Sequence, residues 1–210
     1  EKGGPVEGAQ KVLVRGVLVD MYGTAADSNP IVEESWGRVA DEFGLDLSEI
    51  LAFSHGRPGI EVYAKFLPSM STTEALERVQ QMLAHERSLA HLVRPIPGAD
   101  HFLHRLEALG VPWALVTSAP RDLAVSRFAA AGLPWPRVAV TIEDTTAGKP
   151  DPDGYLQAAS ALGIPADQCV VFEDAPAGIR AGLTAGAPVI AIDPGPPLSA
   201  DRLGKDAALI

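Results

Sequence analysis

Short apolar runs recur along the chain and outline the predicted fold. Each is about five residues long, rich in valine and almost continuously hydrophobic. Runs of this kind are typical of strands that are covered on both faces, as in a parallel sheet. They occupy residues 14–19, 112–117, 137–141, 169–173 and 188–192.

Segments with helical periodicity alternate with the later runs, and each ends at a glycine that can serve as a left-handed C-cap. They cover residues 98–110, 121–132, 153–163 and 175–186. Because strands alternate with helices, the pattern predicts an α/β fold built on a doubly wound parallel sheet.

The connection between the first two apolar runs is about ninety residues long, far more than one crossover helix needs. Residues 30–95 contain helix-like segments and no convincing strand. We therefore expect an α-helical cap domain of four-helix type over residues 27–96. It would be inserted into a core formed by residues 11–26 and 97–210.

Two breaks in the pattern predict the hinges of this cap. One lies at residues 26–29, and the other at 94–98, where "RPIPG" interrupts the helical periodicity. The first ten residues are polar and glycine-rich, so we expect residues 1–10 to form a flexible N-terminal arm.

Charge and composition narrow the class of partner. A formal net charge of −10 argues against a nucleic-acid partner, because a phosphate backbone needs clustered lysine and arginine. No stretch approaches the ~20 apolar residues of a membrane span, so we expect a cytoplasmic protein with no membrane partner. The single Cys169 excludes an intramolecular disulfide, and its apolar run predicts a buried thiol. The sequence leaves the oligomeric state open.

Chemically active side chains follow the predicted strands at their carboxyl ends, where parallel α/β sheets bind ligands. A lysine in "AGKPDPDGY" follows the third run at a short distance. The residues concerned are Asp20, Thr117, Ser118, Lys149, Glu173 and Asp174. Together they predict one site for a phosphate group and a divalent cation.

The residue types suit hydrolysis of a phosphate ester. Asp20 and Asp174 offer the hard oxygen ligands that Mg²⁺ prefers. The metal and Lys149 would offset the repulsion between an anionic nucleophile and an anionic substrate, while Thr117 holds phosphoryl oxygens. An aspartyl phosphate would form and then be hydrolysed by water. The expected partner is therefore a small phosphorylated substrate.

Four motifs in this order resemble the haloacid dehalogenase superfamily, and specifically its helical-cap sugar and polyol phosphatases. They are "DMYGT", "VTSAP", "GKPDPDGY" and "VFEDAPAGIRAG", and the resemblance covers residues 12 to about 195. It implies a Rossmann-like core with an inserted cap.

The resemblance also implies roles for individual residues. Asp20 would be the nucleophile, and Thr117 and Lys149 would bind phosphate. Mg²⁺ would be bound by Asp20, Asp174 and the main-chain carbonyl of Tyr22, with Glu173 supporting the metal or its waters. From the cap motif "HGRP", His55 or Arg57 would contact the substrate.

Tyr22 departs from this resemblance. Phosphatases that resemble the chain carry a second aspartate there, which protonates the leaving oxygen and then activates water. A tyrosine with an unperturbed pKa near ~10 is a poor base at neutral pH. Its carbonyl can still bind metal, so we expect impaired turnover in an intact site.

Three interpretations of Tyr22 remain open. L-2-haloacid dehalogenases of the same superfamily carry a tyrosine at this place and use no metal, but they lack the paired acids of "VFEDAPAG". A natural phosphatase relative could have lost or rerouted its acid/base group. The scaffold could also be engineered and catalytically silent, since Val19, Ala25 and Ala26 stand where relatives carry larger residues.

Simpler structural roles compete with these assignments. Glu173 and Asp174 could cap the helix that follows them. Lys149 could be a solvated loop lysine. The ring of Tyr22 could fill space left by Ala25 and Ala26.

Overall fold

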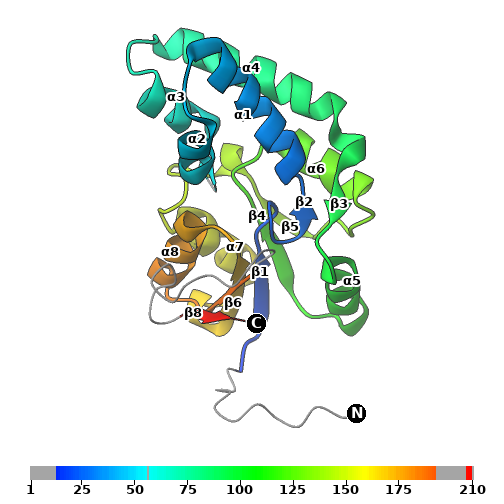
Figure 1. The fold of residues 1–210 in the computed structure, drawn as a ribbon. Coiled ribbons are helices and arrows are strands. Elements are labelled where there is room, and N and C mark those ends of the chain that lie inside the picture. Colours follow the sequence, from blue (N-terminus) through cyan, green and yellow to red (C-terminus); the bar gives the residue numbers. More distant parts are fainter. Residues whose placement is uncertain (1–12, 56, 193–206, 210) are drawn as a thin grey trace.

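The computed structural model describes residues 13–55, 57–192 and 207–209. Figure 1 shows the helices of residues 29–54 and 59–88 gathered at one end of an α/β core. The predicted N-terminal arm, residues 1–10, lies outside the described residues.

The core contains a six-stranded sheet with the order β5-β4-β1-β6-β7-β8. All of its neighbouring strands are parallel. The strands are β1 (Gly16–Val19), β4 (Trp113–Val116), β5 (Val138–Val140), β6 (Cys169–Glu173), β7 (Val189–Ala191) and β8 (Ala207–Leu209). The five runs predicted from the sequence are confirmed as strands. The edge strand β8 was not predicted, because its "AAL" sequence lacks the β-branched residues that mark strands.

Helices cover both faces of this sheet, which confirms the doubly wound arrangement. They are α5 (Ala99–Leu109), α6 (Arg121–Ala130), α7 (Asp153–Leu162) and α8 (Pro176–Thr184). Short 3₁₀ helices are η1 (Ala90–Leu92), η2 (Ile142–Asp144) and η3 (Ala166–Gln168). The glycines predicted to end the four α-helices all have positive φ: Gly110, Gly132, Gly163 and Gly186.

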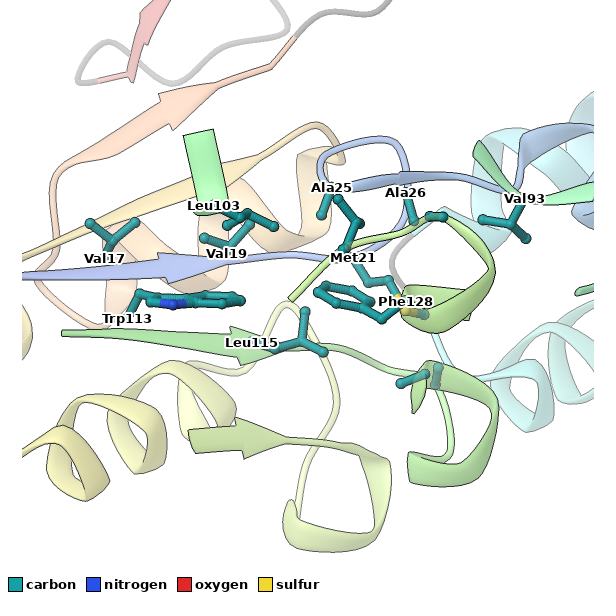
Figure 2. Packing of buried hydrophobic residues seen from close by; sticks show 14 of the residues in the cluster. Val17, Val19, Met21, Ala25, Ala26, Val93, Leu103, Trp113, Leu115 and Phe128 are labelled. Atoms are coloured by element: carbon teal, nitrogen blue, oxygen red, sulfur yellow. The ribbon is translucent and has the colours of Figure 1, made fainter. Parts of the chain in front are cut away.

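Alternate residues of β1 point to opposite faces and so contribute to two cores. Val19 packs in a cluster with Leu103 of α5 and Phe128 of α6 (Figure 2). Leu18 belongs to a second cluster that includes Tyr155 of α7. Because both faces are covered, the ends of the central strands are the accessible parts of the sheet. The predicted core thiol is confirmed, since Cys169 is fully buried.

The cap is helical and has its own apolar cluster around Trp36, Ile50 and Tyr63. Its helices are α1 (Asn29–Phe43), α2 (Leu47–Ser54), α3 (Gly59–Phe66) and α4 (Thr72–Ser88). Helix α2 was not identified from the sequence. Asp46 begins this helix by accepting hydrogen bonds from the Ser48 and Glu49 N–H groups.

Two short strands join the cap to the core. β2 (Ala26–Asp27) pairs antiparallel with β3 (Arg94–Pro95), so the segments predicted as hinges lie side by side. The outgoing and returning chains therefore cross between the two parts at one place (Figure 1). In the described part of the chain, no helix combines the length and apolarity that a membrane crossing requires.

Candidate active site

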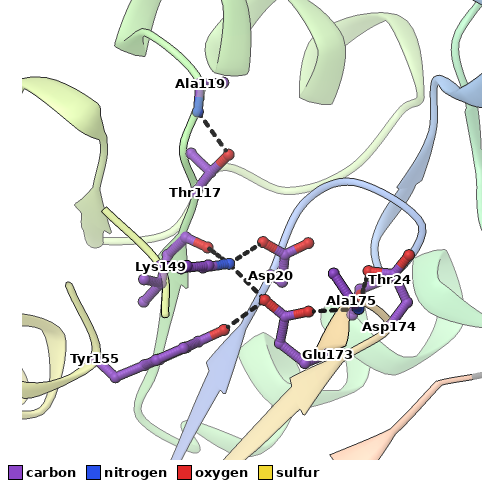
Figure 3. Close-up of polar contacts among 10 residues, drawn as sticks. Asp20, Thr24, Thr117, Ala119, Lys149, Tyr155, Glu173, Asp174 and Ala175 are labelled. Atoms are coloured by element: carbon purple, nitrogen blue, oxygen red, sulfur yellow. Dashed lines mark hydrogen bonds and ion pairs between the residues drawn. The ribbon is translucent and has the colours of Figure 1, made fainter. Parts of the chain in front are cut away.

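Lys149 lies at the centre of a buried polar cluster at the carboxyl ends of β1 and β6. Its ammonium group forms an ion pair with Asp20, which directly follows β1. It also donates to Glu173 Oε1 at 2.6 Å and to the Val116 carbonyl at 3.3 Å (Figure 3). Lys149 and Asp20 are only 6% and 4% exposed. The interpretation of Lys149 as a solvated loop residue is therefore wrong.

Glu173 is held by more than Lys149. Its Oε1 also accepts a hydrogen bond from the Tyr155 hydroxyl at 3.0 Å, and its Oε2 accepts one from the Ala175 N–H at 2.9 Å. A Cβ at Gly178 would lie 1.6 Å from Oε1, so α8 approaches this closely only with glycine there. Helix α8 has no side-chain cap, so neither Glu173 nor Asp174 serves as its N-cap.

Asp174 faces the loop that follows β1. Thr24 donates to its Oδ1 at 3.3 Å. Gly23 has a φ of +69°, and a Cβ there would lie 1.9 Å from Asp174 Oδ2. Only glycine suits both this backbone conformation and this close approach. The loop therefore brings main-chain atoms next to the carboxylate.

The cluster carries more negative than positive charge. Burial and the neighbouring Glu173 raise the pKa of Asp20 to about 7, although Lys149 opposes the shift. Burial, Glu173 and Asp20 raise the pKa of Asp174 well above its usual range. Burial alone would lower the pKa of Lys149, but the two carboxylates outweigh this and raise it.

A divalent cation fits this arrangement. Oxygen atoms of Asp20, Glu173 and Asp174 lie within 4.8 Å of one another. Carboxylate oxygens are the ligands that Mg²⁺ prefers, and a dication would offset the excess negative charge. The ligand chemistry and the charge of the cluster therefore both favour a divalent cation at this position.

Thr117 and Ser118 follow β4 beside the cluster. The Thr117 hydroxyl accepts a hydrogen bond from the Ala119 N–H at 3.1 Å, so its position is fixed. Thr117, Ser118 and Lys149 share a recess of about 20 Å³. The structure thus brings the predicted phosphate-binding residues to the same edge as Asp20 (Figure 3).

The predicted cap residues face the same region from the other side. A cavity of about 90 Å³ between cap and core is lined by His55, Arg57, Tyr22 and Ser118, among others. Arg57 is held by Glu61 at 3.1 Å. Burial lowers the pKa of His55, although the charge of Glu173 opposes this shift. A substrate in this cavity would contact both parts of the protein.

Tyr22 also lines this cavity, and its side chain packs against the core cluster that includes Ala25 and Ala26. The guanidinium carbon of Arg127 lies 4.6 Å from the centre of this ring. Burial raises the pKa of the phenol. The side chain therefore stays neutral at neutral pH.

Sequence reasoning missed three side chains near the site. Tyr155 lies within the quoted motif "GKPDPDGY", but its hydroxyl had no assigned role. Glu86 and Arg127 lie in ordinary amphipathic helical segments, where no local signal distinguishes a buried charge from an exposed one.

Comparison with known proteins identifies the class. The family of haloacid dehalogenase-like hydrolases matches residues 14–186. This match spans most of the chain, and the chain therefore belongs to that family.

Individual relatives match over similar lengths. The chain is 41% identical over 179 residues to hexitol phosphatase A of Escherichia coli, covering 85% of this chain and 83% of the relative. It is 33% identical over 191 residues to glycerol-1-phosphate phosphohydrolase 2 of Saccharomyces cerevisiae, covering 85% and 74%. The family's helical-cap sugar and polyol phosphatases are thus its relatives, as the motifs predicted.

Solved structures agree with the fold. A haloacid dehalogenase family hydrolase from Deinococcus radiodurans, with bound phosphate and sodium, superposes with a TM-score of 0.67 at 30% identity, covering 93% of this chain and 90% of the other. A family member from Entamoeba histolytica gives a TM-score of 0.80 at 25% identity, covering 93% and 91%.

Proposed function

We propose that the protein hydrolyses small sugar or polyol phosphates with Mg²⁺, through an aspartyl phosphate on Asp20, and that Tyr22 slows its turnover. The observation that carries this proposal is the buried pairing of Asp20 with Lys149 at a rim shared with Asp174. The names of the relatives, a hexitol phosphatase and a glycerol-1-phosphate phosphohydrolase, support the substrate class.

In the first step, an Asp20 oxygen attacks phosphorus. The new oxygen–phosphorus bond forms as the ester bond breaks, and the leaving oxygen keeps the bonding electrons and takes a proton from water to give the alcohol. Lys149 reduces the repulsion between the two anions, and Thr117 helps to hold the phosphoryl oxygens. The lysine keeps Asp20 oriented because it is itself fixed by Glu173.

We assign the Mg²⁺ ligands to Asp20, Asp174 and the carbonyl oxygen of Tyr22. When bound, the ion would withdraw negative charge from the phosphoryl group and the nucleophile. Glu173 is less suited to direct ligation, because both of its oxygens already accept hydrogen bonds. We assign it to the orientation of Lys149.

In the second step, water attacks the aspartyl phosphate and releases inorganic phosphate. This step needs a base for the water proton, and the leaving alcohol needs an acid. The buried phenol of Tyr22 has a raised pKa and serves poorly in both roles. We therefore expect the phosphorylated form of Asp20 to persist.

His55 and Arg57 are assigned to the alcohol part of the substrate, because these cap residues line the same cavity as Tyr22. An imidazole ring can accept a hydrogen bond from a substrate hydroxyl or donate one to it, and the guanidinium of Arg57 can donate to hydroxyl oxygens.

Replacement of Tyr22 tests the proposal. Phosphate release from p-nitrophenyl phosphate and from a hexitol phosphate should be measured with Mg²⁺ and with EDTA. Tyr22→Asp should raise the Mg²⁺-dependent rate about 10²-fold or more, whereas Tyr22→Asn should not. Equal rates for the two variants would contradict an acid/base deficit at this position.

Metal-free dehalogenation is the second candidate, favoured by the tyrosine itself. Halide release from L-2-chloropropionate in EDTA would support it. If neither halide nor phosphate is released by any of the three proteins, the silent-scaffold interpretation is the remaining one.

A further inference from the structure

Arg127 and Glu86 form a buried ion pair between core and cap. Arg127 Nη2 lies 2.6 Å from Glu86 Oε2, and the two side chains are 0% and 5% exposed. Arg127 belongs to α6 and Glu86 to α4. The pair therefore joins the two parts of the protein away from solvent.

Only part of the guanidinium is satisfied by this pair. Nε and Nη1 of Arg127 are buried and have no hydrogen-bond partner within the described residues. Unsatisfied buried donors are costly, particularly on a charged group. The position is therefore poor in acceptors as it stands.

The guanidinium also lies against the ring of Tyr22, with its carbon 4.6 Å from the ring centre. A ring face attracts a cation but accepts no directed hydrogen bonds comparable to those of a carboxylate. Tyr22 and Glu86 also line the cavity between cap and core. The three side chains thus connect the catalytic loop, α6 and the cap.

We propose that Arg127, held by Glu86, is a positioning residue for the side chain at position 22, and that its two unused nitrogens form a receptor for a carboxylate there. A carboxylate would accept hydrogen bonds from the guanidinium fork that the phenol ring leaves unpaired. The effect of this interaction on catalysis rests on the proposed function. The interaction between Arg127 and a carboxylate at position 22 does not depend on that function.

Coupling between positions 22 and 127 can be measured by unfolding alone. Tyr22→Asp and Tyr22→Asn remove the same ring and differ in charge. With Arg127 present, the equilibrium constant for unfolding should be at least about tenfold smaller for Tyr22→Asp than for Tyr22→Asn. In an E86Q/R127M background, which leaves neither charge buried alone, this advantage should disappear. An equal difference in both backgrounds overturns the proposal.

Turnover tests positioning separately, because a purely structural role of Arg127 would leave kcat unchanged in a folded variant. For p-nitrophenyl phosphate with Mg²⁺, adding E86Q/R127M to Tyr22→Asp should lower kcat about tenfold and leave KM within about twofold. Unchanged kcat in a folded variant would contradict positioning. If the unfolding measurements show coupling but no variant releases phosphate, the proposed function fails and the carboxylate receptor stands.

Discussion

Two buried cations lie beside the loop that follows β1, and their hydrogen-bonding groups are satisfied to different degrees. Lys149 is paired with Asp20 and Glu173 and also donates to a main-chain carbonyl. Arg127 has one carboxylate and one ring face, and two of its nitrogens have no hydrogen-bond partner among the residues that the structure describes. The half of the site around Asp20, which we propose binds phosphate, thus has a connected polar network, whereas in the half around Tyr22 only Glu86 accepts a hydrogen bond from the Arg127 side chain among the described residues.

The two halves of the site therefore differ in what they can do: one suits phosphate binding, and the other limits the acid/base chemistry of turnover. A satisfied network orients its members, so Asp20 and Lys149 suit phosphate capture. At position 22 the same fold presents a ring where acid/base chemistry needs an ionisable group near neutral pH.

Removal of the proposed nucleophile should have the largest effect. In the Tyr22→Asp protein, which we expect to be the more active one, Asp20→Asn should reduce phosphate release at least about 10³-fold, because the covalent route is lost. Asp41→Asn, which alters an exposed carboxylate on the cap, is the control and should leave the rate unchanged. A small effect at Asp20 would place the chemistry elsewhere.

Loss of Lys149 should strongly destabilise the protein. Lys149→Met leaves Asp20 and Glu173 buried without their cation, and we expect about 3–5 kcal/mol of unfolding free energy to be lost. Urea denaturation monitored by circular dichroism measures this loss. Mg²⁺ should restore part of the stability by offsetting the same carboxylates. Lack of any Mg²⁺ effect would argue against a metal at this rim.

Gly23→Ala should have an intermediate effect. The new methyl group would collide with Asp174 and also impose strain at positive φ. Gly186→Ala is a matched control, since its φ is +85° but no atom lies within 4 Å of the added carbon. The control should lose about 1 kcal/mol, and Gly23→Ala should lose more and bind Mg²⁺ about tenfold more weakly. Calorimetric titration of both variants distinguishes the collision from strain alone.

Tyr155→Phe should have the smallest effect. It removes one hydrogen bond to Glu173 while Lys149 and the Ala175 N–H still hold that carboxylate. We expect a loss of about 1 kcal/mol in urea denaturation and little change in Mg²⁺ affinity. A loss as large as that of Lys149→Met would mean that the tyrosine, and not the lysine, organises the cluster.

Much of the fold, and the polar cluster around Asp20 and Lys149, could be predicted from the sequence. Strands buried on both faces give continuous apolar runs, and in a parallel sheet their carboxyl ends share one edge. That rule alone places Asp20, Glu173 and Asp174 together. The strand β8 was not predicted, because an alanine-rich run of three residues carries no comparable signal.

The half around Tyr22 could not be predicted in the same way. Glu86 and Arg127 are 41 positions apart, and each lies in an amphipathic helix where charges usually face solvent. Their burial results from the packing of the cap against α6, which no local pattern encodes. Tyr22 was recognised as unusual, but its contact with Arg127 required the structure.

Intact-mass spectrometry of the protein after incubation with Mg²⁺ and p-nitrophenyl phosphate tests the central claim most directly. If Asp20 captures phosphate and Tyr22 slows its release, the unaltered protein should gain the mass of one phosphoryl group. Asp20→Asn should gain none, and Tyr22→Asp should retain less because it hydrolyses the adduct. No adduct on the unaltered protein, or an equal adduct on Asp20→Asn, would contradict the account.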